Sequence, residues 1–177
     1  CNSCVEHAPP SIFNERIATY EIGLMMIKRA HPDLADRLTH LRDLNPETTG
    51  LSPTEIYQLL KALPIRASRD EIRSILENDD RLDTLFTPHP EPVDGYRIRQ
   101  VILFGIGECA RSAQGGDLLK RHDLEGFGEL KHLSHNGDRQ FRYQGGEATP
   151  VDNRISDADL NTLATEGSPL AQQSGGY

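Results

Sequence analysis

The spacing of apolar residues constrains the fold of this chain most, because it follows a helical period along most of the sequence. The longest such pattern runs from about residue 94 to residue 112, and we expect it to end at Gly115-Gly116. Its apolar face carries Ile98, Val101, Ile102, Gly105 and Cys109, widened by Phe104 and Ile106. This pattern predicts a central helix in a mainly α-helical fold.

Four further stretches show the same period. A helix is expected from about Asn14 to Arg29, and another is expected to start at Pro32, because proline suits the first helical turn. Two more are expected over residues 123–134 and 157–165, the second capped by Ser156. The apolar positions are Ile17, Tyr20, Leu24 and Ile27; Leu34, Leu38 and Leu41; Leu124, Phe127 and Leu130; and Leu160 and Leu163.

Two short sequences mark helix starts by their capping chemistry. In Ser52-Pro53-Thr54-Glu55, the serine and the glutamate three residues later can each satisfy a free N–H of the first turn. The stretch from Ser68 to Glu71 repeats this spacing. Two small helices are therefore expected, followed by a break at Pro88, Pro90 and Pro92.

The remaining segments lack helical periodicity. Residues 1–8 resemble the end of a strand that runs into a turn, so we expect at most one short strand, at the N-terminus. Residues 136–152 are rich in Gly, Asp, Arg and Gln and are expected to form a loop. The Gly-, Ser- and Gln-rich tail to Tyr177 is expected to be loose.

Composition excludes several classes of function. The chain has 177 residues and a formal net charge of −8, opposite to what a phosphate-binding surface needs, so we expect no nucleic-acid partner. No apolar run approaches the roughly 20 residues of a membrane span, so we expect no membrane partner. Three cysteines are too few for a disulfide framework, which favours a reducing compartment, the cytoplasm.

Potential metal and redox ligands occur in two places. Cys1 and Cys4 have a CxxC spacing, but no second pair completes a zinc site, and prolines follow where a redox motif would open a helix. The richest cluster of potential ligands comprises His122, Glu129, His132, His135 and Asp138. Glu129 and His132 have a Glu-x-x-His spacing, but the second copy that a di-iron bundle needs is missing. We therefore assign no metal ligands and no catalytic residues to this chain.

Glycine patterns also fail to indicate a nucleotide site. Gly105-Ile106-Gly107 lies inside an apolar helical pattern and not after a strand, so close helix packing explains it better than a dinucleotide fingerprint. The Gly-Gly pairs at residues 115, 145 and 175 lack the Lys-Ser/Thr of a phosphate-binding loop.

Two stretches carry a resemblance to a known family. The first is Cys1-Asn2-Ser3, with Val5 and His7, followed by Phe13-Asn14-Glu15-Arg16. The second comprises Arg97 to Val101 with Glu108 and Arg111, then Phe127 to Leu130 and Ser134-His135. In order and spacing they resemble the galactokinase group of GHMP sugar kinases. That group has an Asn-Ser strand, a Tyr-Asn-x-Arg-Arg helix start, an Arg-His-Val-x-x-Glu-x-x-Arg helix and a Gly-x-Leu-Met-x-x-Ser-His helix.

The resemblance implies that the chain is the helical part of an α+β GHMP-kinase C-terminal domain. Residues 1–138 would be its galactokinase-like helical segment, and residues 139–177 a polar loop, short helix and tail of the same domain. The parent enzyme would transfer the ATP γ-phosphate, with Mg²⁺, to a monosaccharide hydroxyl at the anomeric carbon. The phosphate loop and catalytic aspartate precede the Asn-Ser strand in that family, so the isolated chain is expected to be inactive.

The resemblance assigns substrate contacts to Phe13, Asn14 and Arg16, and the remaining kinase polypeptide is the expected partner. Phe13 stands where galactokinases have a sugar-contacting tyrosine, which favours another sugar, such as arabinose or a uronic acid. Ile17 replaces the second arginine and Lys131 the usual methionine. Two other classes stay open: a non-catalytic helical interaction module, and a metal-dependent hydrolase using the cluster from His122 to Asp138.

Overall fold

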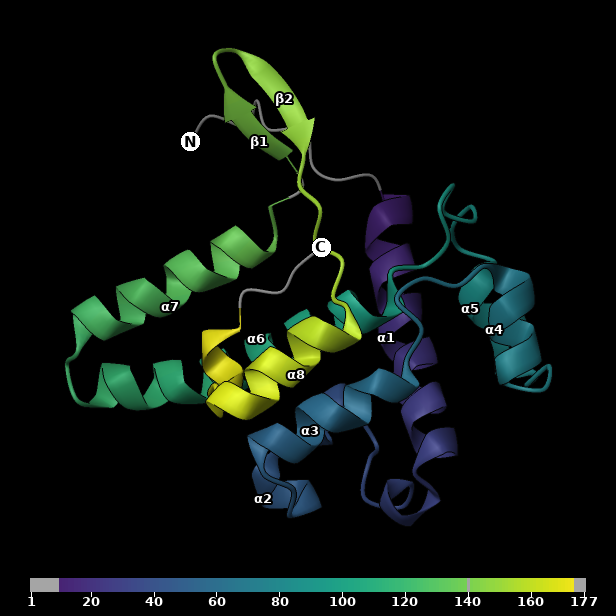
Figure 1. Cartoon of the computed structure of the whole chain (residues 1–177), viewed down its shortest axis with the longest axis horizontal. Helices are drawn as coiled ribbons and strands as arrows, with labels where there is room; N and C mark the ends of the chain where they lie inside the picture. Colours follow the sequence, from purple (N-terminus) through teal and green to yellow (C-terminus); the bar gives the residue numbers. More distant parts are fainter. Residues whose placement is uncertain (1–9, 140, 174–177) are drawn as a thin grey trace.

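The computed structural model describes residues 10–139 and 141–173, and the fold of this part is mainly α-helical, as expected (Figure 1). The expected strand at residues 1–8 lies outside the described residues. The helices are α1 (Pro10–Ala30), α2 (Pro46–Thr49), α3 (Pro53–Leu59), α4 (Arg69–Ile75), α5 (Arg81–Phe86), α6 (Ile98–Lys120), α7 (Leu124–Gly137) and α8 (Asp157–Glu166). Short 3-10 turns are η1 (Pro32–Leu34), η2 (Leu41–Asp43), η3 (Leu60–Ala62) and η4 (Leu170–Gln172), and the strands are β1 (Phe141–Gln144) and β2 (Glu147–Pro150).

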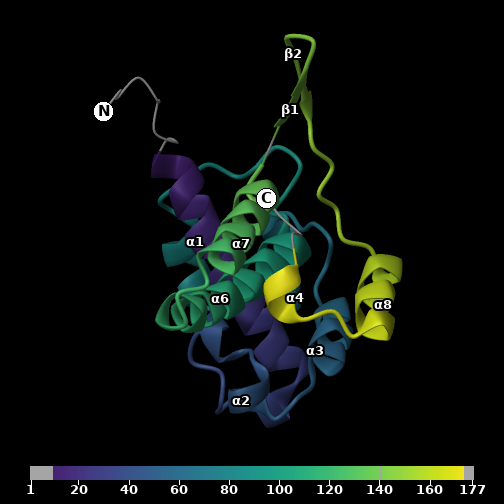
Figure 2. The same cartoon turned by 90° about the vertical axis from the view of Figure 1, so that its left-hand side faces the viewer.

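The core forms around α6, which packs against α1, α7 and η4. Glycine allows α1 and α6 to approach closely, because a Cβ on Gly105 would lie 2.6 Å from Cε1 of Tyr20. The expected packing role of Gly105 is therefore confirmed. The chain that follows β2 returns to the other helices, because α8 packs on α3 (Figure 2).

The helices that were expected from capping boxes are confirmed. The backbone N–H groups of Ser52 and Ser68 donate to the carboxylates of Glu55 and Glu71, each at 2.7 Å. α8 begins with the same arrangement between Ser156 and Asp159.

The helix expected from Pro32 to Leu41 is wrong, because the chain forms the two turns η1 and η2 there. His40 is extended (φ −129°, ψ 162°), and its N–H donates to the Asp43 carboxylate at 2.6 Å. The Asp43 carboxylate thus accepts the hydrogen bond that a backbone carbonyl would accept in a continuous helix. The chain leaves the helical path at His40 and starts a new turn. Leu34 and Leu38 are nevertheless buried.

α6 starts later and ends later than expected. It begins at Ile98 because Gly95 has φ +75° and Tyr96 pairs with Ala67 in an isolated bridge. The expected stop at Gly115-Gly116 is wrong, since the helix continues to Lys120. The Phe127 ring of α7 lies over Gly115, so packing between the two helices compensates for the weak helix propensity of glycine.

α7 is confirmed, but not all of its predicted apolar face is buried. Leu130 is buried, whereas Leu124, in the first turn, is 70% exposed. The expectation that Leu124 points inward is therefore wrong, because the first turn of α7 lies at the end where α6 and α7 are joined, which projects away from the other helices (Figure 1).

The loop expected over residues 136–152 is wrong in part, because β1 and β2 form an antiparallel hairpin. The expectation of at most one short strand, at the N-terminus, is wrong for the same reason. Gly145 and Gly146, with φ of +59° and +86°, form its two-residue turn. The tail, as far as it is described, is not loose: Leu170, Ala171 and Gln173 are buried.

Candidate functional site

The three residues predicted to contact substrate lie in the first turns of α1. The Phe13 ring is 64% exposed. The side-chain amide of Asn14 donates to the carbonyl oxygen of Pro88 at 3.3 Å. Arg16 forms an ion pair with Asp138, its Nη2 lying 2.6 Å from Oδ1. The structure therefore fixes Asn14 and Arg16 to other segments and leaves the Phe13 ring open to a ligand.

The Arg16–Asp138 ion pair joins the start of α1 to the end of α7. Asp138 caps the C-terminus of α7 and is 122 positions along the chain from Arg16. Both side chains are partly exposed, at 25% and 52%. Two distant sequence segments thereby share one surface.

A small cavity of about 300 Å³ lies beside this surface, between α1 and the loop that leads into α6. Glu15 and Arg97 line it, together with Asp94 and the fully exposed Val93. Burial raises the pKa of the Glu15 carboxyl, and the positive charges of Arg97 and Arg16 partly oppose that shift. The cavity therefore offers a carboxyl group and a guanidinium, both able to hydrogen-bond hydroxyl groups.

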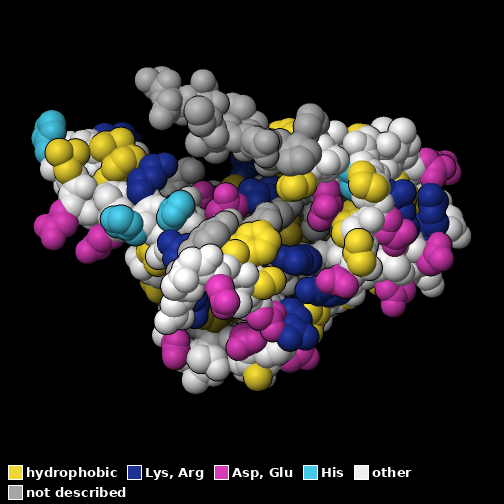
Figure 3. Space-filling view, turned by 90° about the horizontal axis from the view of Figure 1, so that it is seen from above, with side chains coloured by type: hydrophobic (Ala, Val, Ile, Leu, Met, Phe, Trp, Pro, Cys, Tyr) yellow, Lys and Arg dark blue, Asp and Glu magenta, His cyan; other side chains and the backbone are white. Residues whose placement is uncertain are grey.

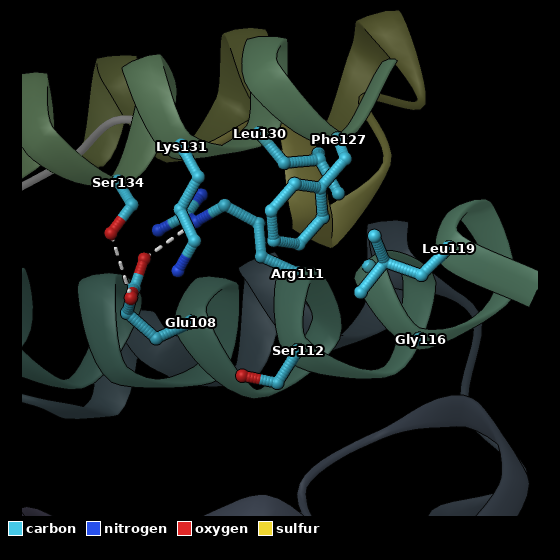
Figure 4. A pocket seen from close by; sticks show the side chains of 10 residues that line it. Glu108, Arg111, Ser112, Gly116, Leu119, Phe127, Leu130, Lys131 and Ser134 are labelled. Atoms are coloured by element: carbon cyan, nitrogen blue, oxygen red, sulfur yellow. Dashed lines mark hydrogen bonds and ion pairs between the residues drawn. The ribbon is translucent and has the colours of Figure 1, made fainter. Parts of the chain in front are cut away.

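A second cavity, of about 330 Å³, lies between α6 and α7 (Figure 4). Glu108 and Arg111 approach it from α6, and Ser134 from α7. Glu108 accepts from Nε of Arg111 at 2.6 Å and from the Ser134 hydroxyl at 2.9 Å. These contacts hold the two helices together along one edge of the cavity.

Arg111 also fixes the last described segment of the chain. Its side chain is 4% exposed, and Nη1 donates to the carbonyl oxygens of Ala171, at 3.0 Å, and Gln173. The guanidinium thus ties η4 to α6.

The potential metal ligands do not come together. Within residues 10–139 and 141–173, no group of three or more His, Cys, Asp or Glu side chains is placed to hold a metal ion. Glu129 and His132 are exposed on α7, and Asp138 pairs with Arg16 instead. Viewed from above, two histidines lie close to each other on the face shown, and another lies at the far left end (Figure 3). The metal-dependent hydrolase therefore has no site among the described residues.

The cysteines offer no described redox site. Cys1 and Cys4 lie outside the described residues. Cys109 is a partly buried free thiol on α6, and burial raises its pKa. A raised pKa keeps the thiol protonated and weakly nucleophilic.

The motif predicts a substrate contact for Arg16 but does not predict its ion pair with Asp138. Asp138 appeared only as a possible metal ligand, because nothing in the local sequence shows that the end of α7 returns to α1. The carbonyl contacts of Arg111 were also missed. The position of Arg111 next to the apolar face of its helix was a signal for these contacts. A guanidinium that is buried there needs several hydrogen-bond acceptors.

Comparisons with protein-family models, curated proteins and solved structures found no match to this chain. None of the helices in the described part of the chain combines the length and apolar character that crossing a bilayer requires.

Proposed function

We propose that this chain forms the sugar-side wall and helical scaffold of an ATP-dependent sugar kinase of the galactokinase group, within a longer cytoplasmic polypeptide. The parent enzyme transfers the γ-phosphate of ATP to a monosaccharide hydroxyl at the anomeric carbon. This chain contributes substrate contacts from Phe13, Asn14 and Arg16.

One observation carries the proposal. The two stretches that resemble sugar kinases are far apart in sequence, yet Arg16 from the first forms its ion pair with Asp138, just after the second. α1, which carries the end of the first stretch, also packs on α6, which carries the beginning of the second. The two stretches are therefore neighbours in the fold, which supports a shared role.

The residues at this surface suit a sugar. Monosaccharides present hydroxyl groups around an apolar ring, so a binding wall needs hydrogen-bonding groups beside an apolar side chain. Asn14 and Arg16 supply donors, and the neighbouring exposed ring of Phe13 supplies apolar contact. The ion pair with Asp138 restrains the guanidinium before substrate arrives, which lowers the entropic cost of binding.

Phosphoryl transfer itself depends on positioning and on neutralising phosphate charge. The described residues offer no carboxylate cluster that fits Mg²⁺. The proposal therefore assigns ATP and Mg²⁺ to the remainder of the kinase polypeptide.

Replacement of Asn14 by alanine in the longer polypeptide tests the assignment. Loss of one polar contact to the sugar is expected to raise the KM for sugar about tenfold while leaving the KM for ATP unchanged. Asn161→Ala is the matched control, since Asn161 lies on α8 and contacts Lys61. An equal effect of both variants, or a change in the ATP constant alone, would show that the start of α1 does not contact sugar.

A further inference from the structure

The hairpin of β1 and β2 projects from the helices as a separate two-stranded sheet (Figure 2). The two strands pack on each other, and neither packs extensively on a described helix. A sheet of two strands is marginally stable in water, and a third strand stabilises it. The hairpin contributes none of the proposed sugar contacts, so an inference about it is independent of the sugar-kinase proposal.

The register of the hairpin determines which backbone groups point away from it. Gln144 and Glu147 flank the two-residue turn and therefore form a hydrogen-bonded pair. Such pairs alternate with non-hydrogen-bonded pairs along an antiparallel ladder, so the backbone groups of Phe141 and Tyr143 point outward from β1. No backbone group of the described residues pairs with them there. Within the described part of the chain, β1 thus has a free edge with two N–H donors and two carbonyl acceptors.

The outer edge of β2 is less suited to a further strand. Its outward groups belong to Ala148 and Pro150, which lie opposite Tyr143 and Phe141. Proline has no N–H, so this edge offers one donor where the edge of β1 offers two. A strand that adds to the hairpin is therefore expected at β1.

The two faces of the hairpin differ in character. Phe141, Ala148 and Pro150 share one face, because they belong to alternate pairs of the ladder. Arg142 and Thr149 form the pair between them and lie on the opposite face. All five side chains are exposed. A strand beside β1 would therefore place an apolar side chain next to Phe141 and a polar side chain opposite Arg142.

Arg142 determines the charge that suits this strand. It forms no ion pair with any described residue, and Asp152, which follows β2, pairs with Arg154 instead. The residue opposite Arg142 in an added strand forms a non-hydrogen-bonded pair, in which the Cα atoms are only about 4.5 Å apart. A carboxylate at that position gains an ion pair, because opposite charges across a pair attract.

The same arginine disfavours a second copy of this chain. Two β1 strands that pair antiparallel through Phe141 and Tyr143 would place one Arg142 directly opposite the other. Like charges in this position are destabilising. The free edge therefore suits an acidic strand better than another β1.

We infer that the free edge of β1 is a docking site for an extended segment of another protein, with an apolar–acidic–apolar sequence. The backbone of that segment pairs antiparallel with Phe141 and Tyr143. Its apolar side chains lie on the face of Phe141, and its carboxylate faces Arg142.

NMR titration of the ¹⁵N-labelled chain with the acetylated peptide Ser-Thr-Val-Glu-Val-Thr-Ser tests this inference. The peptide is expected to shift the backbone amide signals of Phe141 and Tyr143 saturably. The same peptide with lysine in place of glutamate is expected to bind about tenfold more weakly.

A third peptide tests the backbone pairing without any change to the protein. N-methyl groups on both valines remove the donors that face β1, so this peptide is expected not to bind. If it bound as well as the unmodified peptide, pairing along the edge would be excluded.

Two arginine variants locate the binding. Arg142→Glu is expected to reverse the preference, so that the lysine peptide binds about tenfold more tightly than the glutamate peptide. Arg121→Glu is the matched control, since Arg121 is exposed just after α6 and should keep the wild-type preference. Undetectable binding of the glutamate peptide to the wild type, or the same preference in both variants, would overturn the inference. A dimer in sedimentation equilibrium that the peptide does not dissociate would also overturn it, because a second copy would then occupy the edge.

Discussion

Arg99 donates from Nε to the carbonyl oxygen of Leu63 across 3.0 Å, inside the protein. Its Nη1 also reaches the carbonyl oxygen of Ile155 at 3.1 Å and Oδ1 of Asp157 at 2.7 Å. One guanidinium thus connects the start of α6 with the end of η3 and the start of α8. The planar donors of arginine suit this arrangement, because they reach several acceptors at once.

Replacement of Arg99 by alanine is expected to lower the free energy of unfolding by about 3 kcal/mol, because the buried carbonyl oxygens would lose their donor. Asp157→Asn should cost less than about 1 kcal/mol, since that carboxylate is largely exposed. Urea denaturation followed by circular dichroism measures both. A loss below about 1 kcal/mol for Arg99→Ala would show that water replaces these contacts.

The two adjacent glycines of α6 provide a matched pair. A Cβ on Gly116 would meet no atom within 4 Å, whereas one on Gly115 would lie 3.3 Å from Cε2 of Phe127. Gly116→Ala is therefore expected to stabilise the protein by up to about 1 kcal/mol through helix propensity. Gly115→Ala should gain less or lose stability, because the ring has to move. Thermal melting should rank Gly116→Ala above Gly115→Ala, and the opposite order would contradict the described packing of Phe127.

His89 is expected to make stability depend on pH. It is buried with Nε2 2.9 Å from the Tyr96 hydroxyl, which also accepts from Nε of Arg69 at 3.0 Å. Burial and the Arg69 charge lower the pKa of His89. Because the folded-state pKa lies below the unfolded value of about 6.5, the unfolded chain takes up the proton first, and stability falls as the pH drops below about 6.5.

Urea denaturation at pH 7.5 and pH 5 tests this effect. The wild type should lose more stability between the two values than His89→Gln, which cannot titrate. His132→Gln, which changes an exposed histidine of α7, should behave as the wild type does. An identical pH dependence in the wild type and His89→Gln would show that another group is responsible.

Phe13→Tyr probes the choice of sugar. The ring is 64% exposed, so the added hydroxyl should change stability by less than about 0.5 kcal/mol. In the proposed kinase polypeptide, the new hydroxyl is expected to favour galactose over the other sugar by roughly tenfold in kcat/KM. Competition between the two sugars measures that ratio, and an unchanged ratio would show that residue 13 does not contact the substrate.

Helices could be predicted from the sequence where their caps or apolar periodicity lie within the helix itself. Ser52, Ser68 and Ser156 cap their helices through contacts within four residues, so their spacing alone identifies each start. The positions of α1, α6 and α7 follow from apolar periodicity, because each buries one face in the core.

Features that depend on distant contacts could not be predicted. α6 continues through Gly115 because Phe127 packs over it from another helix. β1 does alternate aromatic and polar residues over Phe141 to Gln144, and Gly145-Gly146 marks the turn, but the alternation spans only four residues. β2 and the described side chains of β1 are exposed, so no buried face reinforces this signal. At the candidate site, the motif predicts a substrate contact for Arg16, which stays a prediction. Its ion pair with Asp138 could not be predicted, because that contact exists only once α7 has packed beside α6.

Sugar-dependent release of ADP tests the central proposal most directly. The polypeptide encoded by the whole reading frame would be incubated with ATP, Mg²⁺ and individual monosaccharides, including galactose, arabinose and galacturonic acid. We expect one sugar to stimulate ADP release, with phosphate on its anomeric oxygen by ³¹P NMR, and no turnover by the 177-residue chain alone. The proposal would be contradicted if no sugar stimulated ADP release by the longer polypeptide, or if the 177-residue chain alone turned over.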